Sequence, residues 1–255
     1  MQASRLGLSA RTGGQIAVDA LVTLGVDRLF GVPAAQTAGI YRALRERRAA
    51  ITHVLARHEQ GAAFMAEGFA RATGQVGVAC VVTGVGLGNA VTPMASAMAD
   101  SVPLLVVSSQ VPSFWSALPA RQYNHFVRRS SEGIAASVAK ASFSITDAHE
   151  IAPTLHRAYE LAQSQCPGPV HVEIPADILA ATAGADGGCH EQVPVAANRK
   201  PAASVQAALA EAAVKLWHCQ RPLIIAGGGA IPAAAQLAPL AEVLGAPVVT
   251  TIAGK

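Results

Sequence analysis

The sequence predicts an α/β protein in which a parallel sheet is sandwiched by helices and followed by a shorter βαβ segment. Along the chain, apolar residues at helical spacing alternate with short apolar runs, and turn residues separate them. Hydrophobic residues make up 51% of the sequence but aromatic residues only 4%, a composition typical of Ala-rich helices on buried Val- and Ile-rich strands. The length of 255 residues allows two domains.

The first part of the chain alternates helices and strands in order. Thr12 can cap a helix over residues 14–24, which Gly25 ends. The strands that we expect after it cover residues 28–32, 53–56, 76–82, 104–108, 140–145 and 170–174. The helices that we expect between them cover residues 37–47, 59–73, 89–99 and 147–163. This alternation predicts a parallel sheet with helices on both faces.

Two stretches without periodicity interrupt the alternation. Residues 110–131 contain two prolines and are long for a loop in a compact domain, which favours a functional loop. Residues 179–204 are rich in Gly, Ala and Pro, which marks a linker. We therefore assign residues 1–180 to an N-terminal domain, 181–203 to the linker and 204–255 to the beginning of a second domain.

The second domain is expected to be a truncated Rossmann-like βαβ segment. Ser204 can cap an Ala-rich helix that ends near Trp217. The elements expected after it are a strand over 223–226, a helix that follows Gly227–Gly229 and ends near Gly245, and a strand over 247–252.

Composition and charge argue against several classes of function. The net charge is only +3, and the basic residues are not interleaved with aromatic ones, so nucleic-acid binding is not expected. The four cysteines show no CxxC spacing, and we predict neither a disulfide framework nor a metal site. No run reaches the ~18 apolar residues of a membrane span, so a cytoplasmic protein is expected. The low charged fraction of 14% suggests surface that is covered by other subunits.

Glu59 is the strongest candidate for a chemical role. It opens the predicted helix 59–73 at a strand end, where free N–H groups and the helix dipole stabilise a carboxylate, so one interpretation is a simple capping acid. The residues at i+3, i+4, i+7 and i+11 form a stripe of small side chains that lets another helix approach closely: Ala62, Ala63, Ala66 and Ala70. A Glu buried beside such a contact could share a proton with a ligand nitrogen.

Three other segments follow predicted strands and are expected at the same edge of the sheet, where open α/β sheets bind ligands: residues 30–33, 83–89 and 110–112. The Gly-rich run 83–89 lacks the G-x-G-x-x-G spacing of a dinucleotide fingerprint. Gly227–Gly229 opens a helix, but no acid follows ~20 residues later. A nicotinamide oxidoreductase is therefore disfavoured.

Taken together, these motifs resemble the pyrimidine-binding domain of the acetolactate synthase-like superfamily of thiamine-diphosphate enzymes. The motifs that carry the resemblance are Gly31-Val32-Pro33, Arg57 to Ala63, Met65 to Arg71, Gly84 to Asn89, Asp100 to Pro103 and Pro167 to Asp177. Residues 221–229 and 246–251 resemble the start of the family's central domain.

The resemblance implies roles for individual residues. Glu59 would hydrogen-bond N1′ of the cofactor's aminopyrimidine and so act as a general acid/base on the cofactor. The residues that would shape the pyrimidine slot are Val32, Pro33, Thr83, Gly86 and Asn89. Those that match positions near the substrate are Val111, Pro112 and Lys140. The family's Phe-Gln-Glu motif is replaced by Phe126-Val127-Arg128, and Gln122 is a possible substitute for its glutamine.

The resemblance also implies what lies outside this chain. The family binds the diphosphate and Mg²⁺ through a separate domain with Gly-Asp-Gly and Asn-Asn motifs, and neither motif is present here. We therefore expect that this chain alone neither holds the cofactor nor turns over, and that its partner is the diphosphate-binding domain of another subunit or chain in a homodimer or tetramer. Binding of FAD is left open.

Two alternatives remain for the function. The resemblance implies acetolactate synthase-like decarboxylation and carboligation of 2-oxo acids. A 2-oxo acid decarboxylase of the same superfamily explains the sequence of residues 169–175 and 250–255 equally well. The other is a non-catalytic interaction module that keeps the fold without the diphosphate-binding domain.

Overall fold

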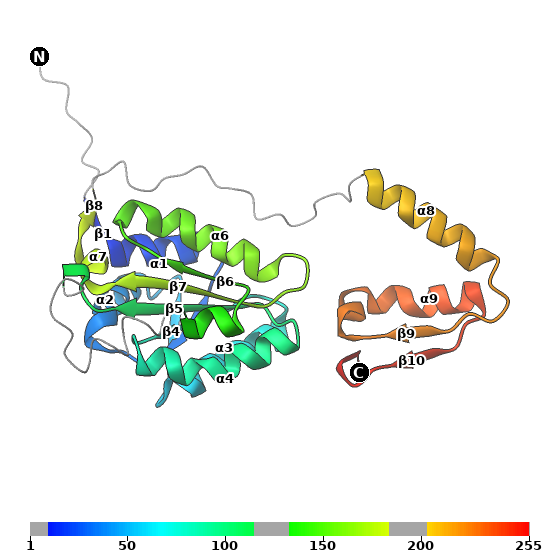
Figure 1. Cartoon of the computed structure of the whole chain (residues 1–255), viewed down its shortest axis with the longest axis horizontal. Coiled ribbons are helices and arrows are strands. Elements are labelled where there is room, and N and C mark those ends of the chain that lie inside the picture. The colour runs from blue at the N-terminus through cyan, green and yellow to red at the C-terminus, as the bar shows by residue number, and fades with distance from the viewer. Residues whose placement is uncertain (1–9, 115–132, 184–202, 255) are drawn as a thin grey trace, which may run out of the picture. The chain divides into compact units, whose positions relative to one another are not determined.

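The computed structural model describes residues 10–114, 133–183 and 203–254 (Figure 1). Its contacts divide the chain into two compact units, Met1–Val195 and Ala196–Lys255. Most of the predicted linker lies outside the described residues, as do Gln122 and residues 126–128 of the predicted loop.

The first unit is built on a six-stranded sheet in which every neighbouring pair is parallel, with the order β3-β2-β4-β5-β7-β6. Its strands are β2 (Arg28–Gly31), β3 (Thr52–Leu55), β4 (Gly77–Val81), β5 (Leu104–Gln110), β6 (Ala141–Ser144) and β7 (Pro169–Pro175). Each predicted strand is present, with ends shifted by a residue or two. The interior strands β4 and β7 are buried at every position, as strands covered on both faces must be.

Helices cover both faces of this sheet, which confirms the predicted fold class (Figure 1). One face carries α1 (Gly13–Thr23), α2 (Ala38–Glu46) and α6 (Ile151–Gln163), which share a core with alternate residues of the strands, such as Leu105 and Val107. The opposite face carries α3 (Glu59–Thr73) and α4 (Val85–Ala99), which pack on Leu104 and Val106. Shorter helices are η1 (Ala35–Thr37), η3 (Ala148–Glu150) and α7 (Ala176–Ala180).

Local signals explain where α1 begins. The Thr12 hydroxyl accepts from the N–H of Gln15, and the Gln15 side chain accepts from the N–H of Thr12, which makes a capping box. Thr12 also belongs to a short antiparallel pair, β1 (Arg11–Thr12) with β8 (Thr182–Ala183), that the sequence did not predict. This pair joins the beginning of the first unit to the segment that follows α7.

The alanine stripe of α3 packs inside the unit. Ala62, Ala63 and Ala66 are fully buried in the core that α3 shares with α4 and the sheet. The helix lies so close to β4 that a Cβ on Gly77 would collide with the carbonyl oxygen of Ala66. The close approach that the stripe predicted is therefore made by α4 and β4, and Gly74 ends the helix in the left-handed conformation, with φ 73°.

The second unit contains α8 (Ala203–Trp217), β9 (Ile224–Ala226), η4 (Gly228–Ala233), α9 (Ala234–Leu244), β10 (Val248–Thr250) and η5 (Ile252–Gly254). Strands β9 and β10 pair in parallel with α9 between them in the chain, as predicted for a βαβ segment. The Gly227–Gly229 run leads into a 3-10 turn before the α-helix. Among the described residues of the whole chain, no helix combines the length and apolar character needed to cross a bilayer.

Candidate functional site

The predicted cofactor residues follow the carboxyl ends of neighbouring strands. Val32 and Pro33 follow β2, Glu59 lies after the end of β3, and Thr83 lies after β4. Because β3, β2 and β4 are parallel neighbours, their carboxyl ends meet at one edge of the sheet. This is the edge at which open α/β sheets bind ligands.

Glu59 is held by a side chain of α4. It is half-buried as the first residue of α3, and its Oε2 accepts a hydrogen bond of 3.1 Å from Asn89 Nδ2. The N-cap of α3 is instead His58, whose Nδ1 accepts from the N–H of Gln60 at 3.2 Å. The observed contact of the Glu59 carboxylate is therefore to the next helix, and the capping role belongs to its neighbour.

Gly86 lets the other carboxylate oxygen lie against the first turn of α4. A Cβ at this position would lie 3.2 Å from Glu59 Oε1 and 2.5 Å from Val82 Cγ1. The N-cap of α4 is Gly84, which has a positive φ of 62° and no side chain that could cap the helix. The unshielded positive end of the α4 dipole is a favourable neighbour for a negative carboxylate.

Tyr41 lies beneath this edge and was not predicted from the sequence. Its hydroxyl occupies the space that a Cβ on Gly31 would take, and its ring packs edge-on against His53 at 4.8 Å. Burial, followed by the neighbouring Cys80 thiol and more weakly by Glu59, raises the pKa of Tyr41 well above its usual range. Among the described residues, this buried hydroxyl makes no hydrogen bond of good geometry. Tyr41 thus supports the turn that leads into Val32 and Pro33.

A second group of polar side chains lies at the ends of β4, β5 and β7. The Thr83 hydroxyl donates to Gln110 Oε1 at 3.0 Å, and the Val111 N–H donates to the same oxygen at 2.8 Å. Gln110 Nε2 donates to Oε2 of the buried Glu173 at 3.1 Å. The structure thus joins Thr83 to Val111, two predicted site residues, through the Gln110 amide oxygen, while Glu173 holds the NH₂ group of the same amide. The sequence assigned no role to Gln110 or Glu173.

The structure does not bring Lys140 to this edge. Lys140 precedes β6, so it lies at the amino end of the parallel sheet, opposite the carboxyl ends described above. Its Nζ donates to three backbone carbonyls at the end of α6, those of Leu161 at 2.6 Å, Ser164 at 2.7 Å and Cys166 at 2.9 Å. These bonds use the three donors of an ammonium group, so Lys140 caps the end of α6 in this chain, and its predicted place near the substrate stays a prediction.

Of the other predicted substrate positions, Val111 is buried and Pro112 half-buried directly after β5. Within the described ranges, no cluster of His, Cys, Asp and Glu side chains could hold a metal ion.

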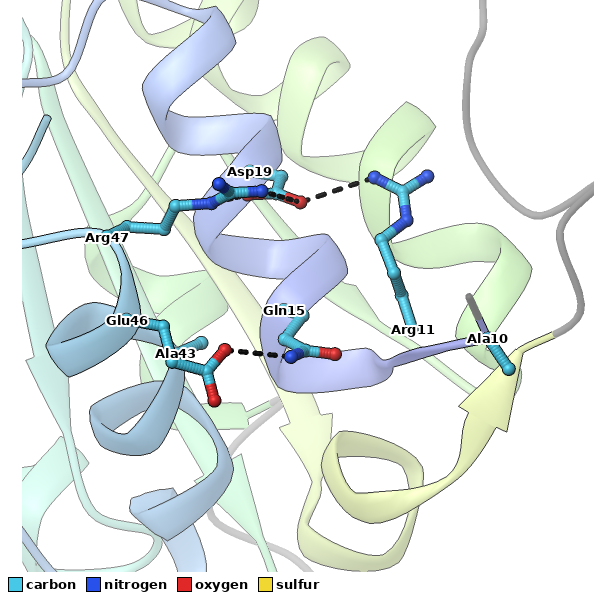
Figure 2. A pocket seen from close by; sticks show the side chains of 7 residues that line it. All are labelled: Ala10, Arg11, Gln15, Asp19, Ala43, Glu46 and Arg47. Atoms are coloured by element: carbon cyan, nitrogen blue, oxygen red, sulfur yellow. Dashed lines mark hydrogen bonds and ion pairs between the residues drawn. The ribbon is translucent and has the colours of Figure 1, made fainter. Parts of the chain in front are cut away.

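A pocket is lined by residues of α1, of α2 and of the segment before α1, and it contains none of the predicted residues (Figure 2). Arg11 and Arg47 both point toward Asp19, with N···O distances of 3.2 and 2.6 Å. Gln15 donates to Glu46 at 2.7 Å. These side chains form ion pairs and hydrogen bonds with one another, so the pocket has few polar groups left to bind a ligand.

Comparisons with known proteins identify related sequences and a related structure. Residues 11–117 match the family model described as thiamine pyrophosphate enzyme, N-terminal TPP binding domain. The chain is 40% identical over 251 residues to a probable 2-ketoarginine decarboxylase of Pseudomonas aeruginosa, covering 96% of this chain and 42% of that protein. It is 37% identical over 245 residues to the acetolactate synthase isozyme 3 large subunit of Escherichia coli, covering 95% and 42%.

Two further relatives point the same way. Glyoxylate carboligase of Escherichia coli O157:H7 is 38% identical over 234 residues, which cover 90% of this chain and 38% of that protein. A solved structure from Mycobacterium smegmatis, of a protein assigned as a thiamin diphosphate-dependent enzyme, superposes with a TM-score of 0.78 at 26% identity, covering 95% of this chain and 45% of that one. The chain therefore spans less than half the length of these relatives. Its residues 11–117 match the N-terminal TPP-binding domain of thiamine pyrophosphate enzymes, and the chain is similar over most of its length to enzymes of the acetolactate synthase-like superfamily.

Proposed function

We propose that Glu59 is the carboxylate that activates the aminopyrimidine of thiamine diphosphate in an enzyme acting on 2-oxo acids. The observation that carries this proposal is the geometry of the carboxylate. Asn89 holds Oε2, and Oε1 lies against the backbone of Gly86 at the carboxyl edge of the sheet. A carboxylate fixed in this way can accept from, or share a proton with, a ring nitrogen that reaches Oε1.

The residues around Glu59 are suited to the pyrimidine half of thiamine diphosphate. Space for a flat ring beside Glu59 depends on Gly86, where a Cβ would come within 3.2 Å of the carboxylate. When it is bound, thiamine diphosphate supplies an electron sink for bond cleavage next to a carbonyl group. The chain's own contribution is to bind the pyrimidine ring, with Val32, Pro33 and Thr83 as further walls, and to hold or move a proton at Glu59.

The relatives support a proposal for the substrate class. Their names describe a decarboxylase of a 2-keto acid, acetolactate synthases and a glyoxylate carboligase. We propose decarboxylation and carboligation of a 2-oxo acid, with simple decarboxylation as the alternative that the first of these relatives supports.

We further propose that the diphosphate and Mg²⁺ are held by the diphosphate-binding domain of another subunit or chain. Exposed apolar side chains on α3 and α4 support this proposal. Phe64, Val85 and Met98 have 41%, 66% and 47% of their surface exposed, and Val85 lies one residue from Gly86. A second subunit that covers this face would enclose the site and exclude water from Glu59.

A titration of the isotopically labelled full chain with 4-amino-5-hydroxymethyl-2-methylpyrimidine, followed by nuclear magnetic resonance, tests the role of Glu59. Because the diphosphate-binding domain that would complete the site is not part of this assay, we expect binding on the order of millimolar. Amide shifts should concentrate at Glu59, Gly86 and Asn89. Glu59→Gln should abolish them, whereas Glu160→Gln on the exposed face of α6 should not. Equal binding by Glu59→Gln, or shifts centred elsewhere, would contradict the proposal.

A further inference from the structure

Two rows of polar side chains cross β5, β7 and β6, one near the middle of these strands and one nearer their carboxyl ends. In the first row, Ser108 and Ser142 bond the two ring nitrogens of His171, at 2.8 and 2.7 Å. The second row lies two residues further along the same strands and contains Gln110 of β5, Glu173 of β7 and Ser144 of β6. Side chains two apart on a strand share a face, so both rows lie on the face that α3 and α4 cover.

The hydrogen bonds of the second row determine which way the Gln110 amide points. A backbone N–H can only donate, so the atom of Gln110 that Val111 N–H touches must be the amide oxygen. The amide NH₂ group therefore faces Glu173, which accepts from it at 3.1 Å. Because Gln110 Oε1 can only accept, the Thr83 hydroxyl must donate its hydrogen to it. Any ligand group that reaches Thr83 then meets an acceptor.

Glu173 is an unexpected residue at its position. It is 6% exposed on the face of the sheet where the apolar side chains of Leu104, Val106 and Met94 form the core with α3 and α4. Burying a polar carboxyl group is unfavourable unless hydrogen bonds compensate for its lost hydration, and an apolar side chain would suit this core better. The presence of Glu173 is explained if its carboxylate oxygens fix the position of the Gln110 amide, which in turn contacts Thr83 and Val111.

We propose that Glu173 is a positioning residue of the cofactor site, which acts through the Gln110 amide on Thr83 and on the Val111 N–H. This inference rests on the proposed function, since Thr83 and Val111 matter for chemistry only if this edge binds the cofactor and substrate. The chain of contacts runs from β7 to β5 and from there to the end of β4. It fixes the orientation of a hydroxyl and of a backbone amide at two neighbouring strand ends.

The experiment measures hydrogen exchange of the Val111 amide in the full chain by nuclear magnetic resonance, with the Val107 amide in the middle of β5 as internal reference. Glu173→Leu should accelerate exchange at Val111 by about two- to tenfold, the range expected for one lost hydrogen bond, and leave Val107 unchanged. Should leucine prevent folding, Glu173→Met is the second variant.

A charge-swapped double variant, Gln110→Glu with Glu173→Gln, keeps every bond of the row, because the carboxylate introduced on β5 would accept from Thr83, from Val111 and from the amide introduced on β7. It should restore protection of Val111 to within about twofold of the wild type. Ser142→Ala, which removes a bond of the other row, should leave Val111 unaffected. Unchanged Val111 exchange in Glu173→Leu, equal acceleration at Val107, or failure of the double variant to restore protection would each overturn the proposal. No cofactor is present in this assay, so its failure is distinct from failure of the pyrimidine titration.

Discussion

Replacing His171 should remove a specific acid sensitivity of the first unit. The ring is fully buried in β7 between the hydroxyls of Ser108 and Ser142, and burial lowers its pKa from 6.5 to about 4. A neutral imidazole has one donor and one acceptor nitrogen, so one serine donates to the ring and the other accepts from it. Protonation would place a positive charge in the sheet's core.

The magnitude follows from the two pKa values. Below pH 6.5 the unfolded chain protonates this histidine, whereas the folded chain does so only below about pH 4. Between these values the unfolded state binds more protons, so the free energy of unfolding falls as the pH falls. The full loss is about 3 kcal/mol, of which about 2 kcal/mol is lost by pH 5. More than about one pH unit above 6.5, both states hold the neutral ring and this residue contributes no pH dependence.

Urea unfolding at pH 7 and pH 5, followed through amide signals of β5 and β7, measures this loss for the first unit alone. His171→Gln should lose about 2 kcal/mol less than the wild type between the two pH values. His149→Gln is the matched control, because His149 is exposed in η3. Equal losses in the wild type and in His171→Gln would show that His171 is not buried in the neutral form.

Three further predictions concern named contacts. Gly86→Ala should destabilise the fold by about 1–3 kcal/mol and weaken pyrimidine binding, because the new Cβ would meet Glu59. Urea denaturation and the pyrimidine titration measure these two effects. Gly88→Ala is the control and should cause neither effect, because its Cβ would meet nothing within 4 Å. Lys140→Met should cost about 1–3 kcal/mol in thermal or urea unfolding and leave the pyrimidine titration unchanged, since it uncaps α6. Thr12→Ala should cost about 1 kcal/mol by the same measurement through loss of the α1 capping box.

The order and type of the strands could be predicted because burial on both faces leaves a strong signal. β4 reads as a continuous apolar run, and the helices between strands carry their own caps, such as Thr12 and Gly74. The start of α4 was misplaced for a physical reason. Two glycines, Gly86 and Gly88, follow Gly84, and each costs a helix about 1 kcal/mol relative to alanine, so a turn as far as Asn89 was the better local prediction. Packing overrides this preference, because the helix begins at Val85 and buries Gly86 and Leu87.

The site was predictable only where the chain's direction determines proximity. Parallel strands bring their carboxyl ends together, so Val32, Glu59 and Thr83 could be grouped without coordinates. No comparable rule predicts from the sequence where a side chain points. Lys140 has a long flexible stem that reaches the carbonyls at the end of α6, and no spacing in the sequence indicates this. Gln110 was noted only as part of a strand-end segment, because its partner Glu173 is remote in the sequence.

The order of the two residues at the start of α3 separates the chemical role of Glu59 from the capping role. A carboxylate that caps a helix accepts hydrogen bonds from N–H groups of its own first turn. Here His58 is the N-cap and accepts from Gln60, so the carboxylate one residue later is free to reach α4. It does so through Asn89, which leaves Oε1 beside Gly86 for another group. Conversion of His58 to Ala should therefore weaken the helix start by about 1 kcal/mol in urea unfolding yet leave the Glu59–Asn89 contact and pyrimidine binding in place. Loss of binding in that variant, with the fold intact, would mean that Glu59 depends on its neighbour's cap for its position.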